Sequence, residues 1–216
     1  MRPSQFDNGQ MRSRCSRMKA MPLWNEKNDR RTSRTRRSLS EALVELIKDK
    51  RFDDITVQNV IDRADIGRST FYSHFRDKED LFQRDWERFL DGFAQHIDWE
   101  KAGEGSFVPV VYLFSHLQDY HHFYKGLVRS RKTDAVFKSG RIHLSQKIET
   151  ALASLLRSKP APTVSLPILA NYLASELFAL LQWWLDHEMP YPPERMDEIF
   201  HELVTPTFRA ALGKSA

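Results

Sequence analysis

The sequence predicts an all-α protein in which three short N-terminal helices are followed by a larger helical bundle. Apolar residues recur at spacings of three and four along most of the chain, as on one face of a helix. Residues that commonly cap helices stand between these periodic segments. The chain has 216 residues, 41% hydrophobic and 29% charged, which is typical of a soluble globular protein of one or two domains.

The first predicted helix carries its apolar residues on one face and ends near Lys50. Its apolar positions are Leu39, Leu43, Leu46 and Ile47. Charged residues fall largely on the other faces, as expected of a helix that covers a small core.

Two shorter helices follow. Thr56 is placed to cap the second, whose apolar residues are Val57, Val60, Ile61 and Ala64. After Asp65-Ile66-Gly67 the pattern resumes at Arg68, and Phe71 and Phe75 are expected to face inward. The small side chain of Ala64 permits a close crossing of the two helices.

The outer face of the third helix is unusually polar for its length. Five residues lie there: Ser69, Thr70, Tyr72, Ser73 and His74. Packing alone does not need so many polar side chains on a helix of two turns. The three helices therefore predict a helix-turn-helix module that reads DNA.

The segment IGRSTFYSHFRDKEDLF resembles the signature of the tetracycline-repressor-like (TetR) family. The resemblance covers about a quarter of the chain, with Thr56, Ala64, Thr70-Phe71-Tyr72, His74-Phe75 and Lys78-Glu79 in register. The family usually has Gly where Asp65 stands and Ser or Thr where Gly67 stands. Asp tolerates the left-handed region and Gly is a weaker N-cap, so the turn is retained. The second change puts in doubt a phosphate contact from a capping hydroxyl.

We expect Ser69, Thr70, Tyr72 and Ser73 to contact bases or adjacent phosphates. We expect the contacts to the DNA phosphate backbone to come from Thr56, His74, Lys78, Arg36 and Arg37. Asp77 is placed to cap the next helix, so Lys78 would lie in its first turn. There its ammonium would join free backbone amides in binding a phosphate.

The predicted organisation is a disordered basic tail (residues 1–30), the helix-turn-helix domain (31–77) and a C-terminal helical domain for ligand binding and dimerisation (78–216). Residues 1–37 hold eleven Lys and Arg against three acidic residues, although the net charge of the whole chain is only +4. Such a tail either follows the DNA backbone or is a solvated extension. Its single cysteine, Cys15, indicates a reducing, cytoplasmic location and no internal disulfide.

Five helices are predicted in the C-terminal part after a long connecting helix. The connecting helix runs from Asp77 to about Ile97, with apolar residues at Phe82, Trp86, Phe89, Phe93 and Ile97. The others are expected at residues 107–120, 123–132, 134–156, 166–185 and 193–211. Pro193 suits the first turn of the last helix.

The helix from Leu166 to Leu185 is apolar on almost all sides. A membrane span is rejected because Asn171, Glu176 and Gln182 interrupt the segment. Such a helix must be covered on every face. We therefore predict a homodimer, with a further contribution from Ile199, Leu203, Val204 and Phe208. The resemblance agrees, because in the TetR family the last two helices form a four-helix bundle across a two-fold axis.

The resemblance also implies a pocket for an unknown small-molecule effector within the bundle. Candidate lining residues are Tyr112, His116, Tyr120, Phe123 and Trp183, although aromatic residues at helical spacing are also common in cores. His116, His121 and His122 lack the spacing of metal ligands, so neither a metal nor a cofactor is expected.

The expected function is a transcriptional regulator that binds a palindromic double-stranded operator. The favoured form is a repressor that a small molecule releases. The alternative is a ligand-independent regulator or adaptor whose bundle binds a protein partner. No catalytic motif was found, so an enzyme is not expected.

Overall fold

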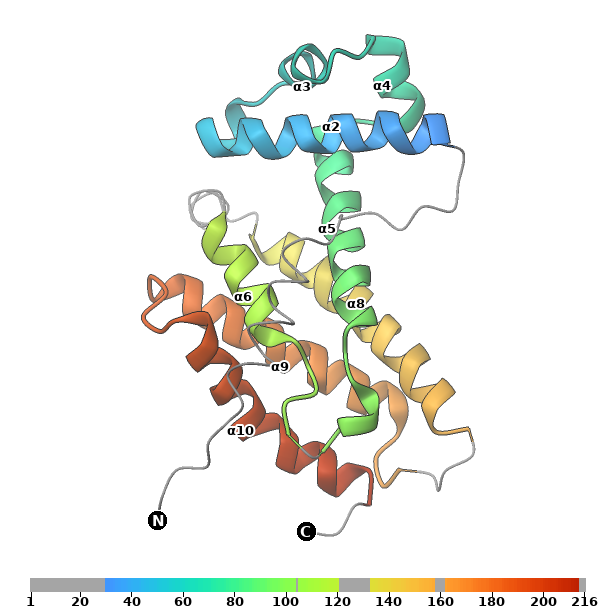
Figure 1. The fold of residues 1–216 in the computed structure, drawn as a ribbon, viewed down its shortest axis with the longest axis vertical. Coiled ribbons are helices and arrows are strands. Elements are labelled where there is room, and N and C mark those ends of the chain that lie inside the picture. Colours follow the sequence, from blue (N-terminus) through green and yellow to red (C-terminus); the bar gives the residue numbers. More distant parts are fainter. Residues whose placement is uncertain (1–29, 104, 121–132, 158–161, 214–216) are drawn as a thin grey trace.

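The computed structural model describes residues 30–103, 105–120, 133–157 and 162–213 (Figure 1). In these ranges the regular elements are all helices, which confirms the predicted fold class. The α-helices are α2 (Arg30–Asp49), α3 (Val57–Ala64), α4 (Arg68–His74), α5 (Lys78–Gln95), α6 (Val110–Asp119), α8 (Thr133–Leu155), α9 (Leu166–Asp186) and α10 (Pro193–Ala211). Two 3₁₀ turns are η1 (Phe52–Asp54) and η2 (Trp99–Lys101). The tail, Cys15, Phe123 and the helix predicted at 123–132 lie outside the described residues.

Helix α5 belongs to both halves of the molecule. In Figure 1, α2 lies across one end with α3 and α4 on its outer side, and α5 runs from there into the bundle of α6, α8, α9 and α10. The last residues of α4 are separated from α5 by only three residues. The end of α4 therefore lies close to the start of α5.

Local chemistry sets the ends of the short helices. The Thr56 hydroxyl accepts a hydrogen bond from the Asn59 amide, while the Asn59 side chain accepts one from the Thr56 amide, so α3 begins with a reciprocal capping box. Asp65 ends α3 in the left-handed conformation, at φ 52° and ψ 50°. Gly67 stands at the N-cap of α4 without a side-chain bond. The predicted roles of these residues are confirmed.

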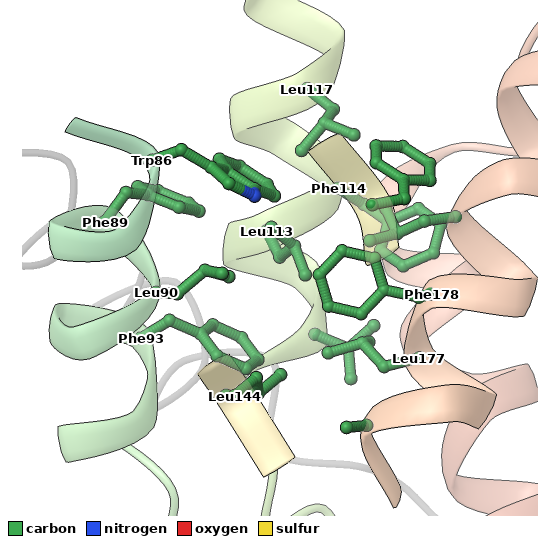
Figure 2. Close-up of a cluster of buried hydrophobic side chains, with 14 of the residues drawn as sticks. Trp86, Phe89, Leu90, Phe93, Leu113, Phe114, Leu117, Leu144, Leu177 and Phe178 are labelled. Atoms are coloured by element: carbon green, nitrogen blue, oxygen red, sulfur yellow. The ribbon is translucent and has the colours of Figure 1, made fainter. Parts of the chain in front are cut away.

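Aromatic residues of α5 enter the core of the bundle. Figure 2 shows Trp86, Phe89, Leu90 and Phe93 facing side chains of α6, α8 and α9. Gly140 of α8 permits this approach, because a Cβ there would lie 2.5 Å from Trp86 Nε1 and 2.9 Å from Phe178 Cζ. Helices α5, α8 and α9 thus pack more closely than a larger residue at position 140 would allow.

Four polar residues of α10 bind the backbone of the first turn of α6 and of the segment that precedes it. They are spaced four apart, so they lie along one face of the helix: Asp197, His201, Thr205 and Arg209. Asp197 Oδ1 accepts from the Val111 amide, and His201 Nε2 accepts from the amides of Phe107 and Val108. The Thr205 hydroxyl donates to Gly105 O at 3.3 Å, and Arg209 Nε donates to Gly103 O at 2.8 Å.

The glycine at position 103 is required by this packing. Its φ is +84°, and a Cβ there would lie 3.0 Å from the Cα of Arg209. Any other residue would meet both backbone strain and a steric contact.

The contacts with His201 change the predicted start of α6. The sequence predicts a helix from Phe107, whereas α6 begins at Val110 with Pro109 as its N-cap. The Phe107 and Val108 amides are bound to His201, and the Phe107 carbonyl accepts from the Asp98 amide at 2.8 Å. These residues are more than ninety positions from His201, so local pattern cannot reveal the contact.

The set of apolar residues predicted at the homodimer contact also needs one correction. Val204 and Phe208 are fully buried within their own chain, so they are not available to a partner. Leu203 is 51% exposed, and Ile168 and Trp183 of α9 are 63% and 42% exposed.

We predict that His201→Phe lowers the free energy of unfolding by ~2–5 kcal/mol, measured by urea denaturation. The substitution leaves two buried backbone amides unpaired, at about 1–3 kcal/mol each. His187→Phe, at an exposed histidine after α9, is the matched control and should change stability by less than ~0.5 kcal/mol. A loss below ~1 kcal/mol for His201→Phe would contradict the proposed bonding.

Candidate nucleic-acid interface

Two buried phenylalanines, Phe71 within α4 and Phe75 at its C-cap, fix the orientation of this helix. Phe71 and Phe75 are buried, with exposed fractions of 0% and 2%, and their ring centroids are 5.9 Å apart. Arg84 of α5 lies over the Phe75 ring at 5.6 Å. Because both rings occupy the inner face, the other side of the helix is left to polar residues.

The outer face of α4 carries the predicted base-reading residues. Ser69 and Ser73 are exposed, Tyr72 is 49% exposed, and Thr70 is partly buried. The Ser73 hydroxyl donates to Thr70 O at 2.7 Å. In this arrangement Ser73 offers a DNA base an acceptor rather than a donor.

Arg68 was not predicted as a contact residue, yet it is exposed at the first position of α4. Its guanidinium lies 5.8 Å from the centre of the Tyr72 ring. An Arg on the outer face of such a helix can bind guanine through two hydrogen bonds. The signal in the sequence was its spacing of four from Tyr72.

The surroundings of Thr56 and His74 restrict the hydrogen bonds that these residues can make to a DNA phosphate. The Thr56 hydroxyl already accepts from the Asn59 amide, but its own hydrogen remains available to a phosphate. Burial, and then the nearby Arg36, lower the pKa of His74 below its ordinary value. The neutral form of His74 is therefore favoured in the DNA-free chain.

Arg36 and Arg37 lie on α2, and both are partly buried. Arg36 Nε is buried with no hydrogen-bond partner in the described part of the chain. Its charge acts on His74 and on Arg88 of α5. Arg36 thus lies on the inner side of the module, where its charge disfavours a positive charge on His74 of α4 and on Arg88 of α5.

Lys78 is bound within the protein. Its ammonium donates to three backbone carbonyls, Phe52 O at 2.6 Å, Ile55 O at 2.6 Å and Asp53 O at 3.1 Å. A lysine has three N–H donors, so all of them are used here. The phosphate contact predicted for Lys78 requires a donor that this geometry does not supply.

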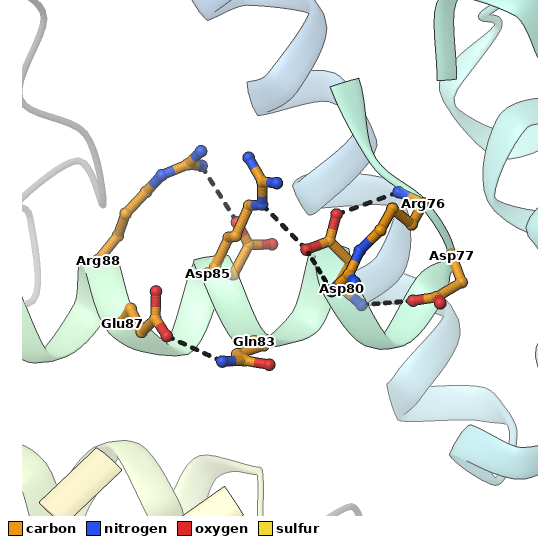
Figure 3. Close-up of polar contacts among 8 residues, drawn as sticks. Arg76, Asp77, Asp80, Gln83, Asp85, Glu87 and Arg88 are labelled. Atoms are coloured by element: carbon orange, nitrogen blue, oxygen red, sulfur yellow. Dashed lines mark hydrogen bonds and ion pairs between the residues drawn. The ribbon is translucent and has the colours of Figure 1, made fainter. Parts of the chain in front are cut away.

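The junction of α2 and α5 contains two carboxylates with opposite pKa shifts (Figure 3). Burial raises the pKa of Asp85 to about 6, although the Ser40 hydroxyl and Arg88 oppose that shift. Burial also acts to raise the pKa of Asp80, but hydrogen bonds from the Arg76 amide and Arg84 outweigh it and the pKa is lowered. Asp85 Oδ2 is buried with no hydrogen-bond partner among the described residues.

Aromatic residues of α6 gather against α5. Phe89 stacks on Tyr112 at 5.6 Å and on His116 at 4.1 Å, and His116 lies 4.9 Å from Tyr120. Burial lowers the pKa of His116 to about 4, so its ring is neutral at pH 7. The structure therefore brings together three of the predicted pocket residues.

Trp183 is not part of this aromatic group. It is 42% exposed at the end of α9, where its ring stacks on His187 at 4.5 Å. The adjacent Trp184 is the buried one, and its indole donates to Tyr191 O at 2.8 Å.

Comparison with known proteins agrees with this geometry. Residues 39–84 match the family model described as bacterial regulatory proteins, tetR family, and residues 109–206 match one described as transcriptional regulator C-terminal region. The chain belongs to the TetR family. The first match spans the second half of α2, η1, α3, α4 and the start of α5, and the second spans most of the bundle.

One curated relative is an uncharacterized HTH-type transcriptional regulator, YxbF, of Bacillus subtilis (strain 168). It is 24% identical over 197 residues, which is 82% of this chain and 47% of the relative. The TetR-family chain thus spans about half the length of that protein.

Solved structures share the fold at low identity. A putative TetR-family regulator from Syntrophomonas wolfei has a TM-score of 0.60 at 16% identity, covering 80% of this chain and 94% of its own. The dihydroxyacetone kinase operon activator DhaS has a TM-score of 0.57 at 18% identity, covering 82% and 98%. The repressor AlkX from Dietzia has a TM-score of 0.52 at 16% identity, covering 82% and 97%.

The described helices include none that is long and apolar enough to cross a membrane.

We predict that Asp85→Asn removes a pH dependence of stability. The pKa of Asp85 is raised from 3.8 to about 6 in the folded chain, so the folded state binds this proton more tightly than the unfolded state. The free energy of unfolding should therefore fall as the pH rises from about 4 to about 6, by at most ~3 kcal/mol. Asp85→Asn should remove this fall and raise stability at pH 7.5, measured by urea denaturation across that range.

Asp80→Asn is the control, because the pKa of Asp80 is shifted in the opposite direction from that of Asp85. The pKa of Asp80 is lowered, so its charged form stabilises the fold above the ordinary carboxyl pKa and this contribution is lost in acid. Asp80→Asn should therefore lower stability at pH 7.5. An Asp85→Asn protein with an unchanged pH profile would contradict the role given to Asp85.

Proposed function

We propose that this chain is a sequence-specific DNA-binding transcriptional regulator that acts as a homodimer on a palindromic operator. The observation that carries the proposal is α4. This helix is held by Phe71 and by its C-cap residue Phe75, both buried, and its outer face carries hydroxyls, a phenol and a guanidinium. A helix of this kind can enter the major groove and hydrogen-bond base edges.

Within the proposed interface, Arg68, Ser69, Thr70, Tyr72 and Ser73 read bases. Thr56 and His74 hydrogen-bond the DNA backbone, and Arg36 and Arg37 supply positive charge. One helix of this length reads only a few base pairs, so two copies are needed to recognise a longer DNA site. Their half-sites on the duplex would be centred about 34 Å apart, or a multiple of that.

The exposed apolar residues of α9 and α10 support dimerisation. Ile168, Trp183 and Leu203 are each more than two-fifths exposed, and Ile199 is partly buried. Exposed apolar side chains along two contacting helices favour a second copy as their cover. Dimerisation through the last two helices is also what membership of the family implies.

The proposed effector site is the aromatic group of Phe89, Tyr112, His116 and Tyr120. A ligand that displaced His116 would act on Phe89 of α5 directly. Lys48, at the end of α2, lies over the Tyr120 ring at 5.8 Å, so the same ligand would also disturb a contact with the DNA-binding half. A difference of ~1–3 kcal/mol in ligand affinity between the two conformations changes operator occupancy many-fold.

We favour a repressor that leaves its operator when the effector binds, but the fold is compatible with both repression and activation. Proteins of similar structure include one named as an activator and one named as a repressor. A bundle that bound no metabolite and instead retained a protein partner would favour the adaptor alternative. We do not propose an enzymatic activity, because the family consists of regulators.

The direct test is selection of duplexes from a random pool with the purified protein. A two-fold symmetric consensus is expected, and candidate metabolites are then added to the same binding assay. Failure to retain any duplex at low salt would contradict the proposed function.

We predict that Tyr72→Phe and Arg37→Gln act differently on the selected duplex. Loss of the Tyr72 hydroxyl should change the preferred base at one position of each half-site, by ~1–3 kcal/mol, with little effect on a random duplex. Arg37→Gln should weaken both duplexes alike and reduce the salt slope by about 0.9 for each protomer. Equal losses on both duplexes for both variants would contradict this division.

A further inference from the structure

The ammonium of Lys78 joins two elements that are distant in sequence. Lys78 is the first residue of α5, and its three acceptors are the carbonyls of Phe52, Asp53 and Ile55, in and just after η1. Phe52 O also accepts from the Ile55 amide at 3.2 Å, a bond that closes η1. A carbonyl oxygen has two lone pairs, so Phe52 O can accept from Lys78 as well. A lysine ammonium binds several carbonyls at once because its three donors point in different directions.

Aromatic packing holds the same two elements together. The Lys78 ammonium lies 4.9 Å from the centre of the Phe52 ring, and Phe82 packs on that ring at 5.5 Å. Lys78 and Phe82 are four residues apart, so they lie on the same face of α5. Phe52 is only 8% exposed between them.

These contacts connect the beginning of the helix-turn-helix module, at η1, to its end, at the start of α5. From η1 the chain passes through the Thr56 cap into α3, then α4, and returns through residues 75–77 to α5. Lys78 then binds back to η1. The link thus ties η1, which precedes α3, to the first turn of α5, which follows α4 after three residues.

We propose that Lys78 is a positioning residue for DNA recognition. Its ammonium fixes η1 on the first turn of α5 and thereby sets the tilt of α4 in the groove, without itself contacting a phosphate. The inference rests on the proposed DNA-binding function, but the link between Lys78 and η1 can be tested in the absence of DNA.

The first experiment uses the wild-type protein and reductive methylation of lysines, read by mass spectrometry. Lys78 is expected to be protected both in the free protein and on DNA, because its three donors are bound to carbonyls. Lys50, exposed just after α2, is the control that should react in the free protein. If Lys78 reacts like Lys50 in the free protein and becomes protected only when the selected duplex is added, the proposal is overturned.

The second experiment measures binding of Lys78→Met and Lys78→Arg to the selected and random duplexes as a function of salt. For a positioning role, Lys78→Met should lose about 10- to 100-fold in affinity for the selected duplex, with the random duplex little changed. Its salt slope should stay at the wild-type value. Lys78→Arg should behave similarly, because a planar guanidinium cannot direct three donors to the same carbonyls.

A phosphate contact gives the opposite pattern. Lys78→Met would then reduce the salt slope by about 0.9 for each protomer and weaken both duplexes alike, while Lys78→Arg would bind like the wild type. That result overturns the proposal. Arg37→Gln serves as the reference for loss of a phosphate contact. If the wild-type protein retains no duplex, the proposed function fails, and methylation of the free protein still decides whether Lys78 is held by η1.

Discussion

The burial of Phe71 and Phe75 is the constraint on which the DNA-reading surface depends. A helix of seven residues has almost no stability of its own in water, so α4 is helical because its inner face is packed. Once both rings are buried, the 3.6-residue period directs Ser69, Tyr72 and Ser73 to the other side. The surface that we propose to read DNA is thus a consequence of the packing beneath it.

The shared helix α5 gives this surface a mechanical connection to the bundle. Asp77 caps its start by accepting from the Asp80 amide at 2.7 Å, and Phe89, in its second half, stacks on His116 of α6. Gly140 lets the Trp86 ring lie close to α8. A ligand that changed the packing around Phe89 would have to move α5 or deform it, and either change would reach the three residues that join α5 to α4.

Polar contacts on α10 stabilise the other end of α5. The chain that leaves α5 runs through residues 98–109, and α10 binds this segment through His201, Thr205 and Arg209. The outer side of α10 carries Leu203, which we assign to the contact between copies. One helix thus links the proposed dimer contact with the segment that connects α5 and α6.

Most helix boundaries were predictable because short-range chemistry determines them. Thr56, Asp65 and Asp77 act through bonds or backbone conformations within four residues, and each was identified from the sequence. The start of α6 was not, because His201 captures two amides from a distant part of the chain. Exposed residues of α4 were found from the helical period.

The roles of individual charged groups were less predictable. Lys78 has the position of a phosphate ligand, but its donors are directed to η1 by a turn that the sequence did not reveal as a 3₁₀ helix. Val204 and Phe208 have the apolar character of interface residues, yet they face their own chain. In each case the side chain's direction depends on which elements meet in space.

Photo-crosslinking from the outer face of α4 is the measurement that tests the central claim most directly. Tyr72 is replaced by p-benzoylphenylalanine, and the protein is irradiated on the selected duplex. Tyr191, also exposed at 44% but located between α9 and α10, receives the same replacement as a control. We predict crosslinks from position 72 to major-groove bases in each half-site and none from position 191. Absence of crosslinks from position 72 to a duplex that the protein demonstrably binds would contradict the claim that α4 reads DNA.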